Sequence, residues 1–396
     1  MTATPPRHKL MIVAGEPSGD AHAAALVRSL REAAPESRVE VFGATGPLMR
    51  AAGVDSVIQS DDLAILGLLE IGRALPKFWR AFKKLKQAAI ERNPQAVILV
   101  DWPDFNLRLA RSLHRRGLKI IYYISPQLWA WRSYRLKTIK RDVELLLTIL
   151  PFERDWYAKR GVSQVEFVGH PLAGEVEARF GREDFCRFHN LDPARPIISL
   201  LPGSRRKELH RILPAMLDAA ALISAARPDV QFVTLLAPGR SPKEAREVVN
   251  AMSDAAQLPE IFRILKHETR EALAASDVAA VASGTVTLEA ALLGTPMVIV
   301  YKESAINWHL LGSLITTDHY GLVNLIAGER IVTELMQDEL NGERLAGELM
   351  LLLDTQRNQA LRNRLHDVAH QLGEGGASRR AARRILAAVL DHKQER

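Results

Sequence analysis

Two carboxylates and an amide stand where one of the most apolar runs of the chain ends. Asp101, Asp104 and Asn106 belong to the segment DWPDFN, which follows the run AVILV at residues 96–100. Such a run is typical of a buried parallel strand, and ligands often bind at the carboxyl end of one. A carboxylate there can act as a general base toward a substrate hydroxyl. The pattern leaves open whether Asp101 or Asp104 is the base, and Asp104 also suits capping of the next helix.

A third acidic residue, Glu16, stands in another turn between an apolar run and a helical pattern. The run LMIVA at residues 10–14 is followed by GEPSGD at residues 15–20. This turn is neither the GxGxxG of dinucleotide-binding proteins nor the Gly-Lys-Ser/Thr of a P-loop. A carboxylate at the beginning of a helix repels phosphate, so Glu16 suits contact with sugar hydroxyls or helix capping.

Residues 278–302 show the clearest order of strand, turn, helix and strand. VAAVAS predicts the first strand, Ser283, Gly284 and Thr285 form the turn, and PMVIVY predicts the second strand. The N–H groups of a helix that begins after this turn could bind a phosphate, and Glu289 could accept hydrogen bonds from a ribose. An ordinary βαβ unit with a capped helix explains the same pattern.

A similar turn follows the predicted strand at residues 197–201. It reads PGSR, in which Gly203 permits a close backbone approach and Arg205 could neutralise a diphosphate. We therefore predict a second anion-binding turn here.

Aromatic and cationic residues gather after the predicted strand KIIYYIS. Trp129, Arg132 and Arg135 offer stacking surfaces and positive charge, but no known nucleic-acid-binding module surrounds them. We expect contact with a sugar or an anionic head group, and no nucleic acid partner. His170 ends a further predicted strand, where it is either a ligand contact or a structural histidine.

The segment at residues 63–92 has the composition of a helix at a membrane surface. Residues 71–92 carry seven Lys or Arg and one acidic residue, and aromatic residues are interleaved with them. A helix that faces the core and has a wet basic side explains the composition equally well. Pro76 is expected to divide the segment into two helices. The candidate membrane residues are Leu66, Leu68, Leu69, Phe78, Trp79 and Phe82.

The composition excludes several classes of protein. The chain has 396 residues, 47% of them hydrophobic and 25% charged, as expected for two globular domains. No apolar run is long enough to span a membrane, and the first residues lack the apolar region of a signal peptide. A single cysteine allows no intrachain disulfide. The sequence contains neither paired CxxC motifs nor HExxH, so it does not predict a metal site. The absence of GxGxxG disfavours a dinucleotide-dependent oxidoreductase.

Charge and strand pattern both divide the chain into two halves. Residues 1–170 hold 26 Lys and Arg against 17 Asp and Glu, whereas the remainder holds 27 against 29. The basic half predicts an anionic partner, although a skewed but solvated surface would give the same count. Each half alternates strands with helices, which predicts two doubly wound α/β domains. We place them at residues 1–172 and 173–365, and place C-terminal helices at 366–396.

Eight motifs together resemble one enzyme family, the lipid A disaccharide synthases. In order along the chain they are GEPSGD, DWPDFN, ISPQLWAWR, LPFE, VGHP, LLPGSR, SGTVTLEAALLGTPMV and LVNLIAG. The resemblance covers residues 8–375. It implies a GT-B glycosyltransferase, with two Rossmann-like domains facing a cleft and the last helices crossing back to the first domain. It also implies a homodimer.

The resemblance implies a reaction and a location. Such an enzyme moves 2,3-diacylglucosamine from UDP to 2,3-diacylglucosamine 1-phosphate (lipid X), forming a β-1,6-linked disaccharide and UDP with inversion. It needs neither a metal nor another cofactor. It would act as a peripheral protein on the cytoplasmic face of the bacterial inner membrane, whose anionic surface would be its partner.

The resemblance also implies roles for individual residues. Glu16, Asp101, Arg205 and Asn324 match the family's functionally important positions. Further motif positions are expected to bind UDP or the acceptor: Gly203, Ser204, Ser283, Gly284, Thr285, Glu289, Asp104, Trp129, Arg132 and His170. Two alternatives share the pattern at residues 278–302: another GT-B enzyme such as a UDP-sugar epimerase, and a binding protein without catalytic activity. The first should lack DWPDFN and ISPQLWAWR, and the second would need no acid at Asp101.

Overall fold

The structure is a computed structural model that describes residues 7–63, 71–252, 262–304, 317 and 319–391. The chain forms two compact units, which we describe separately. The first consists of Met1–Pro171 with Glu374–Arg396, and the second of Leu172–Gly373. The candidate membrane residues Leu66, Leu68 and Leu69 lie outside the described residues.

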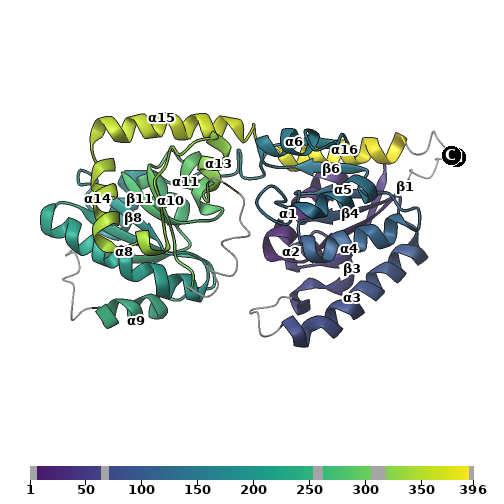
Figure 1. Cartoon of the computed structure of the whole chain (residues 1–396), viewed down its shortest axis with the longest axis horizontal. Coiled ribbons are helices and arrows are strands. Elements are labelled where there is room, and N and C mark those ends of the chain that lie inside the picture. Colours follow the sequence, from purple (N-terminus) through teal and green to yellow (C-terminus); the bar gives the residue numbers. More distant parts are fainter. Residues whose placement is uncertain (1–6, 64–70, 253–261, 305–316, 318, 392–396) are drawn as a thin grey trace. The chain divides into compact units, whose positions relative to one another are not determined.

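The first unit is built on a parallel sheet that has seven strands in the described part of the chain, in the order β3-β2-β1-β4-β5-β6-β7 (Figure 1). Its strands are β1 (Arg7–Ala14), β2 (Arg38–Thr45), β3 (Asp55–Gln59), β4 (Ala96–Val100), β5 (Ile120–Tyr123), β6 (Leu145–Thr148) and β7 (Val165–Phe167). The helices are α1 (Pro17–Ala33), α2 (Pro47–Ala51), α3 (Ile71–Arg92), α4 (Pro103–His114), α5 (Leu136–Asp142), α6 (Pro151–Ala158) and α16 (Ala377–Asp391), with 3₁₀ turns η1 (Ser60–Leu63) and η3 (Ser133–Arg135).

Helices cover both faces of this sheet, which explains why its strands are apolar at nearly every position. Successive strand residues point to opposite faces. Leu10 and Ile12 of β1 pack in a cluster with residues of α1 and α16, whereas Met11 and Val13 pack in a cluster with residues of α3 and α4. Both faces are therefore buried, as in doubly wound folds.

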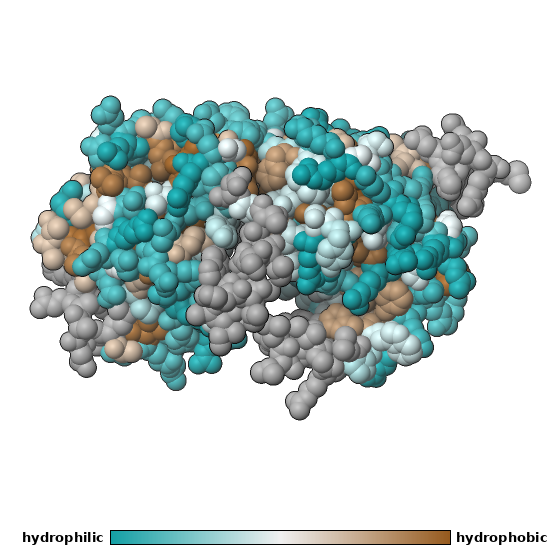
Figure 2. Space-filling view, in the orientation of Figure 1, coloured by the Kyte–Doolittle hydropathy of each residue, from teal (hydrophilic) through white to brown (hydrophobic). Residues whose placement is uncertain are grey.

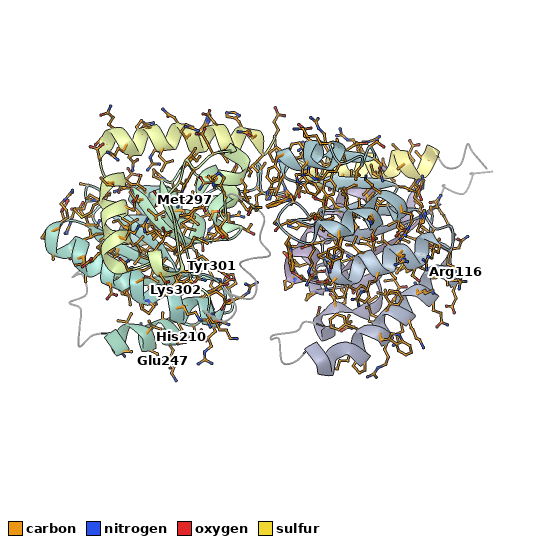
Figure 3. The ribbon with its side chains drawn as sticks, in the orientation of Figure 1. Arg116, His210, Glu247, Met297, Tyr301 and Lys302 are labelled. Carbon is orange, nitrogen blue, oxygen red and sulfur yellow. The ribbon has the colours of Figure 1, made fainter. Side chains whose placement is uncertain are left out.

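The second unit repeats this architecture with a parallel sheet whose described strands number six, in the order β10-β9-β8-β11-β12-β13. They are β8 (Ile197–Leu201), β9 (Gln231–Leu236), β10 (Phe262–Lys266), β11 (Val278–Ala282), β12 (Met297–Tyr301) and β13 (Glu334–Met336). The helices are α7 (Arg182–His189), α8 (Arg206–Ala226), α9 (Pro242–Met252), α10 (Thr269–Ala275), α11 (Val286–Leu292), α13 (Leu322–Ala327), α14 (Gly342–Leu352) and α15 (Thr355–Gln371), with the 3₁₀ turn η5 (Gln337–Glu339). Figure 3 marks the first and last residues of β12, Met297 and Tyr301, and Lys302 after it.

One local prediction was wrong. Residues 71–92 form the single helix α3, and Pro76 lies within its second turn instead of dividing it. A proline at the sixth residue of a helix removes only the one hydrogen bond that its N–H would donate, and the remaining turns of this 22-residue helix keep it continuous. Residues 171–196 contain α7, whose Phe185 is fully buried.

The helix α8 is the one described helix that is long and apolar enough to cross a membrane by length and composition. Half of its most apolar window is buried, and it packs against α14 and α9. These contacts are typical of a core helix in a globular domain.

The end of the chain returns to the first unit. The helix α16 packs on α1, and its Arg380 donates a hydrogen bond to the Val168 carbonyl at 2.8 Å. Ile385 and Val389 are buried in the same cluster as strand β1. The division between the units lies at Gly373, whereas the boundary expected at residue 366 falls inside α15.

Candidate active site

In the first unit, two predicted turns meet where the strand order reverses. Strands β1 and β4 are neighbours, and the chain continues from them toward opposite edges of the sheet. Ala14, the last residue of β1, pairs with Val100, the last residue of β4. The turns that begin at Gly15 and Asp101 therefore emerge side by side, at the kind of crevice where doubly wound sheets bind ligands.

Asp101 is held in a strained backbone conformation. Asp101 and Trp102 have φ angles of 48° and 51°, in the left-handed region that few residues other than glycine occupy. The Asp101 carbonyl accepts hydrogen bonds from the Tyr122 hydroxyl at 2.6 Å and from Nδ2 of Asn106 at 2.7 Å. Strain of this kind costs about 1–3 kcal/mol and concentrates at functional sites. The buried side chains of Tyr122 and Asn106 are what hold the turn in place.

The surroundings of Asp101 make its carboxylate more basic than usual. Burial, and after it the negative charge of Glu16, together raise the pKa of Asp101 to about 6, against the opposite effect of the Trp102 N–H. A carboxylate with a pKa near the working pH is a better general base than an ordinary one.

Glu16 does not cap the helix α1. It occupies the N-cap position, but its side chain makes no capping hydrogen bond and is exposed. Its backbone carbonyl accepts the Asp20 N–H at 2.8 Å. The capping interpretation is therefore wrong, and the carboxylate of Glu16 stays available to a ligand.

Asp104 also does not cap its helix. Its side chain is 58% exposed and accepts hydrogen bonds from Nη1 of Arg132 at 2.8 Å and from Nη2 of Arg135. Two guanidinium groups thus occupy the oxygen Oδ1 of Asp104. This oxygen of Asp104 is therefore less available to accept a proton from a substrate.

Trp129 is buried, so it cannot serve as the stacking surface that the sequence suggested. Its indole N–H donates to Oε1 of Glu153 at 3.1 Å, and the Ser125 hydroxyl donates to the same oxygen at 2.8 Å. Burial raises the pKa of Glu153 to about 7, against the effect of these donors and of the Leu150 N–H. Sequence reasoning missed Glu153, although an acidic residue directly after the apolar run ILPF was a signal.

His170 is buried and uncharged at neutral pH. Burial, and after it the nearby His22 of α1, together lower its pKa to about 4. Burial also lowers the pKa of His22. These positions suit a structural histidine better than a phosphate contact.

Gly15 is required for the packing of this turn, and its replacement by alanine tests that requirement. A Cβ at residue 15 would lie 2.0 Å from the Trp102 ring, so the ring and the Asp101 turn would have to move. We expect Gly15→Ala to lower turnover about 10- to 100-fold, as misplaced catalytic groups do, and to destabilise the protein by about 1–3 kcal/mol.

Gly19 of the same motif provides the matched control, because a Cβ there would meet Ala14 at an ordinary 3.7 Å. Steady-state kinetics and thermal unfolding of the two variants would be compared. Equal effects of Gly15→Ala and Gly19→Ala would contradict the proposed packing requirement.

The second unit brings its two predicted turns together in the same way. Strands β8 and β11 are neighbours at the reversal of strand order, and Leu201 pairs with Val281 near their carboxyl ends. The PGSR turn and the turn at residues 283–285 therefore lie side by side. Each unit thus has a pair of turns at the position where ligands bind in this fold class.

The PGSR turn is fixed by a glutamate that the sequence analysis did not single out. Oε2 of Glu208 accepts the N–H groups of Ser204 at 2.9 Å and Arg205 at 3.0 Å. Gly203 has a φ of 107°, and a Cβ on it would lie 2.6 Å from the same oxygen. The Arg205 side chain is 79% exposed, so its guanidinium can reach a ligand even though Nη1 contacts Glu208 at 3.1 Å.

The turn after β11 is open to solvent. Gly284 and Thr285 are exposed, and the Ser283 hydroxyl donates to the Tyr320 carbonyl at 3.3 Å. Glu289 lies in α11 and accepts a hydrogen bond from Nε of Arg270 at 3.3 Å. One carboxylate oxygen of Glu289 is thus engaged, and a carboxylate has further acceptor capacity for a ribose.

Asn324 cannot be a catalytic residue in this structure. It is fully buried, and its Nδ2 donates to the Val332 carbonyl and to Glu334 Oε1, both at 2.8 Å. Its Oδ1 accepts the N–H groups of Ile331 and Val332, both at 2.9 Å. These four bonds use its full hydrogen-bonding capacity. Asn324 therefore positions the loop after α13.

The comparison with known proteins identifies the family. Residues 10–388 match the family model for lipid-A-disaccharide synthetase. The lipid-A-disaccharide synthase of Trichlorobacter lovleyi is 43% identical over 382 residues, covering 96% of this chain and 97% of that protein. The chain belongs to the lipid-A-disaccharide synthase family.

Other relatives and solved structures agree with this assignment. The lipid-A-disaccharide synthase of Solibacter usitatus is 42% identical over 97% of this chain and 99% of its own length. Among solved structures, the calicheamicin glycosyltransferase CalG4 has a TM-score of 0.58 at 16% identity, covering 98% of this chain and 99% of that one. The UDP-GlcNAc 2-epimerase of Neisseria meningitidis has a TM-score of 0.60 at 10% identity, with coverages of 96% and 99%. These two likenesses show the fold alone.

The family assignment and the fold confirm two predictions. The chain has the GT-B type of architecture, with two parallel α/β domains. As a member of this family it is a glycosyltransferase that forms the lipid A disaccharide from a UDP-sugar and a lipid. Neither alternative function, the other GT-B enzyme or the non-catalytic binding protein, is favoured.

Two of the candidate membrane residues pack inward. Phe78 and Phe82 contact Phe105, with ring centroids 6.3 and 5.9 Å apart, and belong to the packing of α3 on the first sheet. Trp79, in contrast, is 60% exposed, and Nζ of Lys83 lies 3.4 Å from its ring centroid. In Figure 2 the face shown is mostly hydrophilic, and its hydrophobic residues appear in separate patches.

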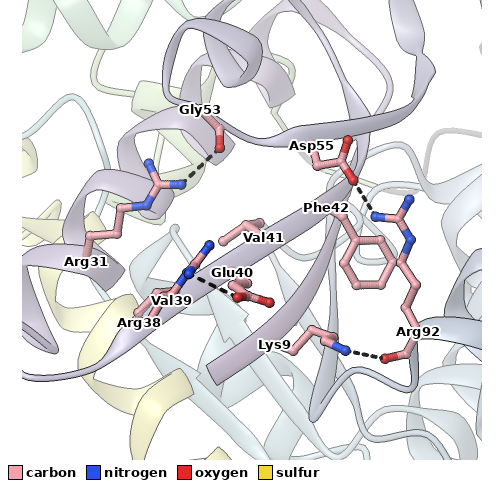
Figure 4. A pocket seen from close by; sticks show the side chains of 10 residues that line it. All are labelled: Lys9, Arg31, Arg38, Val39, Glu40, Val41, Phe42, Gly53, Asp55 and Arg92. Carbon is pink, nitrogen blue, oxygen red and sulfur yellow. Dashed lines mark hydrogen bonds and ion pairs between the residues drawn. The ribbon is translucent and has the colours of Figure 1, made fainter. Parts of the chain in front are cut away.

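An open cavity of about 450 Å³ lies at the other edge of the first sheet, where β1 and β2 begin (Figure 4). Its cations already have partners. Lys9 donates to the Arg92 carbonyl at 3.1 Å, Arg31 donates to the carbonyls of Ala52 and Gly53, and Arg38 pairs with Glu40 at 3.1 Å. This cavity is remote from the carboxyl ends of the strands, and we assign it no catalytic role. No cluster of His, Cys, Asp and Glu suited to a metal occurs among the described residues.

Proposed function

We propose that this chain transfers 2,3-diacylglucosamine from UDP to the 6-hydroxyl of 2,3-diacylglucosamine 1-phosphate, with Asp101 as the general base. The observation that carries the assignment of the base is the raised pKa of Asp101, about 6, at the reversal of strand order. The acceptor oxygen loses its proton to Asp101 as it attacks the anomeric carbon, and the bond from that carbon to UDP breaks with inversion. The transition state resembles an oxocarbenium ion, as in inverting glycosidases.

The remaining roles in the first unit follow from exposure and charge. Glu16 is exposed and close enough to Asp101 for its charge to raise the Asp101 pKa. We assign Glu16 to hydrogen bonds with the hydroxyls of the acceptor sugar and to tuning of the base.

In the second unit, Arg205 and the N–H groups of Gly284 and Thr285 would stabilise the negative charge that UDP acquires as it leaves, whereas the Ser283 N–H donates to the Val300 carbonyl at 2.9 Å. Groups that are aimed at developing charge usually make the largest contribution to catalysis. Glu289 would accept hydrogen bonds from the ribose. Asn324 would act only through the loop that it supports.

Replacing Arg205 with alanine tests the donor side. We expect the affinity for UDP to fall about 10- to 100-fold, because a hydrogen bond to a charged group contributes about 1.5–3 kcal/mol, and turnover to fall with it. Isothermal titration with UDP measures the affinity, and steady-state kinetics measure the turnover. Arg187→Ala, an arginine 70% exposed on α7, serves as the control. Unchanged UDP affinity in Arg205→Ala would remove Arg205 from the donor site.

A turnover assay tests the proposed reaction itself. Purified protein in detergent would receive UDP-2,3-diacylglucosamine, the 1-phosphate acceptor and EDTA, and both UDP and disaccharide would be measured. Equal amounts of the two products would support the reaction and its independence of metal. UDP release without disaccharide, or no release, would contradict the proposed acceptor.

We also propose that the protein is peripheral on the cytoplasmic face of the inner membrane, with α3 nearest the lipid. The exposed Trp79 beside Lys83 and the basic composition of α3 support this location. Aromatic rings favour the membrane interface, and each cation near an anionic surface contributes about 1 kcal/mol.

We further propose that the protein is a homodimer, which the family resemblance alone implies. Analytical ultracentrifugation tests this proposal.

Replacing Trp79 with serine tests the proposed membrane contact. We expect several-fold weaker binding to vesicles rich in phosphatidylglycerol, measured by cosedimentation, because an interfacial ring is lost. Phe188→Ser, which removes a 56% exposed aromatic residue from the second unit, is the control and should bind like the original protein. Binding that is indifferent to both Trp79 and vesicle charge would contradict α3 as the membrane contact.

A further inference from the structure

A charged cluster in the first unit has no role in the mechanism described above. Asp104, in the first turn of α4, holds the guanidinium groups of Arg132 and Arg135, which follow β5 in the sequence. The side chains of Asp104 and Arg132 are 58% and 37% exposed, while that of Arg135 is 14% exposed. The three groups carry one net positive charge.

Arg132 is held in a fixed position. Its φ of 55° places its backbone in the left-handed region, and its guanidinium lies 4.2 Å from the ring centroid of Trp131. A non-glycine residue keeps such a conformation only when its surroundings enforce it, and such residues concentrate at functional sites. Asp104 contacts one nitrogen of Arg132, whereas a guanidinium has five N–H donors, so Arg132 has donors for a second anion.

The cluster lies beside the base. The buried Tyr122 hydroxyl, which donates to the Asp101 carbonyl, has a pKa well above its usual value, because of burial first and of the charge of Asp101 second. Arg135 lowers the pKa of the same hydroxyl, and Asp104 raises it. The geometry agrees, because Asp104 lies three residues after Asp101, in the first turn of the helix that follows the Asp101 turn.

The position of the cluster suggests its ligand. In the proposed acceptor, the 6-hydroxyl and the 1-phosphate are carried at C5 (through C6) and at C1, the two carbons that flank the ring oxygen, so a phosphate site is needed close to the base. Arginine side chains recognise phosphate through paired N–H donors. We propose that Arg132 and Arg135 bind the phosphate of the acceptor, and that Asp104 is the positioning residue that holds both. This inference rests on the proposed function.

Binding in the absence of the donor tests the inference separately from turnover. Isothermal titration in detergent would use 2,3-diacylglucosamine 1-phosphate and 2,3-diacylglucosamine, which lacks the phosphate. We expect Arg132→Gln to weaken binding of the phosphorylated lipid about 10- to 100-fold and binding of the other lipid less than about 3-fold. Arg135→Lys, which keeps the charge but loses the paired donors, should show a smaller loss of the same selectivity.

Arg154→Gln is the matched control, since Arg154 is a 58% exposed arginine of the same unit that pairs with Asp155. It should leave both affinities unchanged. Thermal unfolding of each variant shows whether it is folded. Equal losses for the two lipids, or no loss for the phosphorylated lipid, would overturn the phosphate site. A phosphate-selective loss in a protein that forms no disaccharide would support the phosphate site and refute the proposed reaction.

Discussion

Replacing Asp101 with asparagine should lower turnover about 10²- to 10⁴-fold and leave the affinity for UDP nearly unchanged. The range is that of a general base removed from a reaction. Asparagine is the appropriate substitution because it tolerates the left-handed backbone that Asp101 adopts, whereas alanine would add strain. Steady-state kinetics and titration with UDP measure the two quantities. A parallel loss of UDP affinity would contradict the assigned role.

The pH dependence gives a second readout of the same residue. Since the pKa of Asp101 is about 6, kcat/KM should fall as the pH drops below about 6, where the carboxylate becomes protonated. Glu16→Gln removes a negative charge that raises this pKa, so the acidic limb should move to lower pH. If the acidic limb of the kcat/KM profile stays in place in Glu16→Gln, Glu16 and Asp101 are not electrostatically coupled.

As the pH rises through 6, the free energy of unfolding should fall, whereas activity should rise. A carboxyl pKa raised from 3.8 to about 6 destabilises the folded state above pH 6 by about 3 kcal/mol, and this cost disappears as the pH falls toward 4. Asp101→Asn should therefore be more stable than the original protein at pH 8 and similar to it near pH 4. Asp155→Asn, at a 60% exposed site, should show neither effect.

Removing α16 by ending the chain at Gly373 should unfold the first unit. Ile385, Leu386 and Val389 are buried against β1 and α1, and fully burying such a side chain contributes about 1.5–3 kcal/mol. The sum approaches the whole stability of a typical domain, about 5–15 kcal/mol. We expect the shortened chain to be insoluble, or to lose the unfolding transition of the first unit in calorimetry.

Point variants within α16 distinguish the loss of its buried side chains from the effect of shortening the chain. Ile385→Ala should cost about 2–5 kcal/mol, because Ile385 is fully buried. Leu390→Ala, on the same helix but 49% exposed, should cost less than about 1 kcal/mol. Similar costs for the two variants, or a stable chain that ends at Gly373, would show that α16 is dispensable.

The sequence was most informative where local patterns decide the structure. Short apolar runs followed by polar turns located β1, β4, β8 and β11, and therefore the turns at Gly15, Asp101, Gly203 and Ser283. The parallel arrangement then brought these turns together in pairs, because the carboxyl ends of parallel strands meet at one edge of a sheet. Alternation of strands and helices was enough to predict that arrangement.

Tertiary contacts decided the rest. The left-handed turn at Asp101 depends on Tyr122, 21 residues further along the chain, and the burial of Trp129 depends on Glu153, 24 residues away. Asn324 looked catalytic in a motif, yet its partners at residues 331–334 use all of its donors and acceptors. No pattern of residue types along the chain shows which partners a side chain will find, because the folded structure decides them.

The return of α16 to the first unit has a consequence for how the protein is made. During synthesis the ribosome completes residues 1–171 first, then all of Leu172–Gly373, and only then the helix that covers the first sheet. At a synthesis rate of about 5–20 residues per second, the face of the first sheet that α16 covers stays exposed for roughly 10–40 s. Exposed apolar surface of this kind favours aggregation, and the contact is very long in sequence, which slows folding. We expect the nascent chain to be a chaperone substrate until its last helix leaves the ribosome.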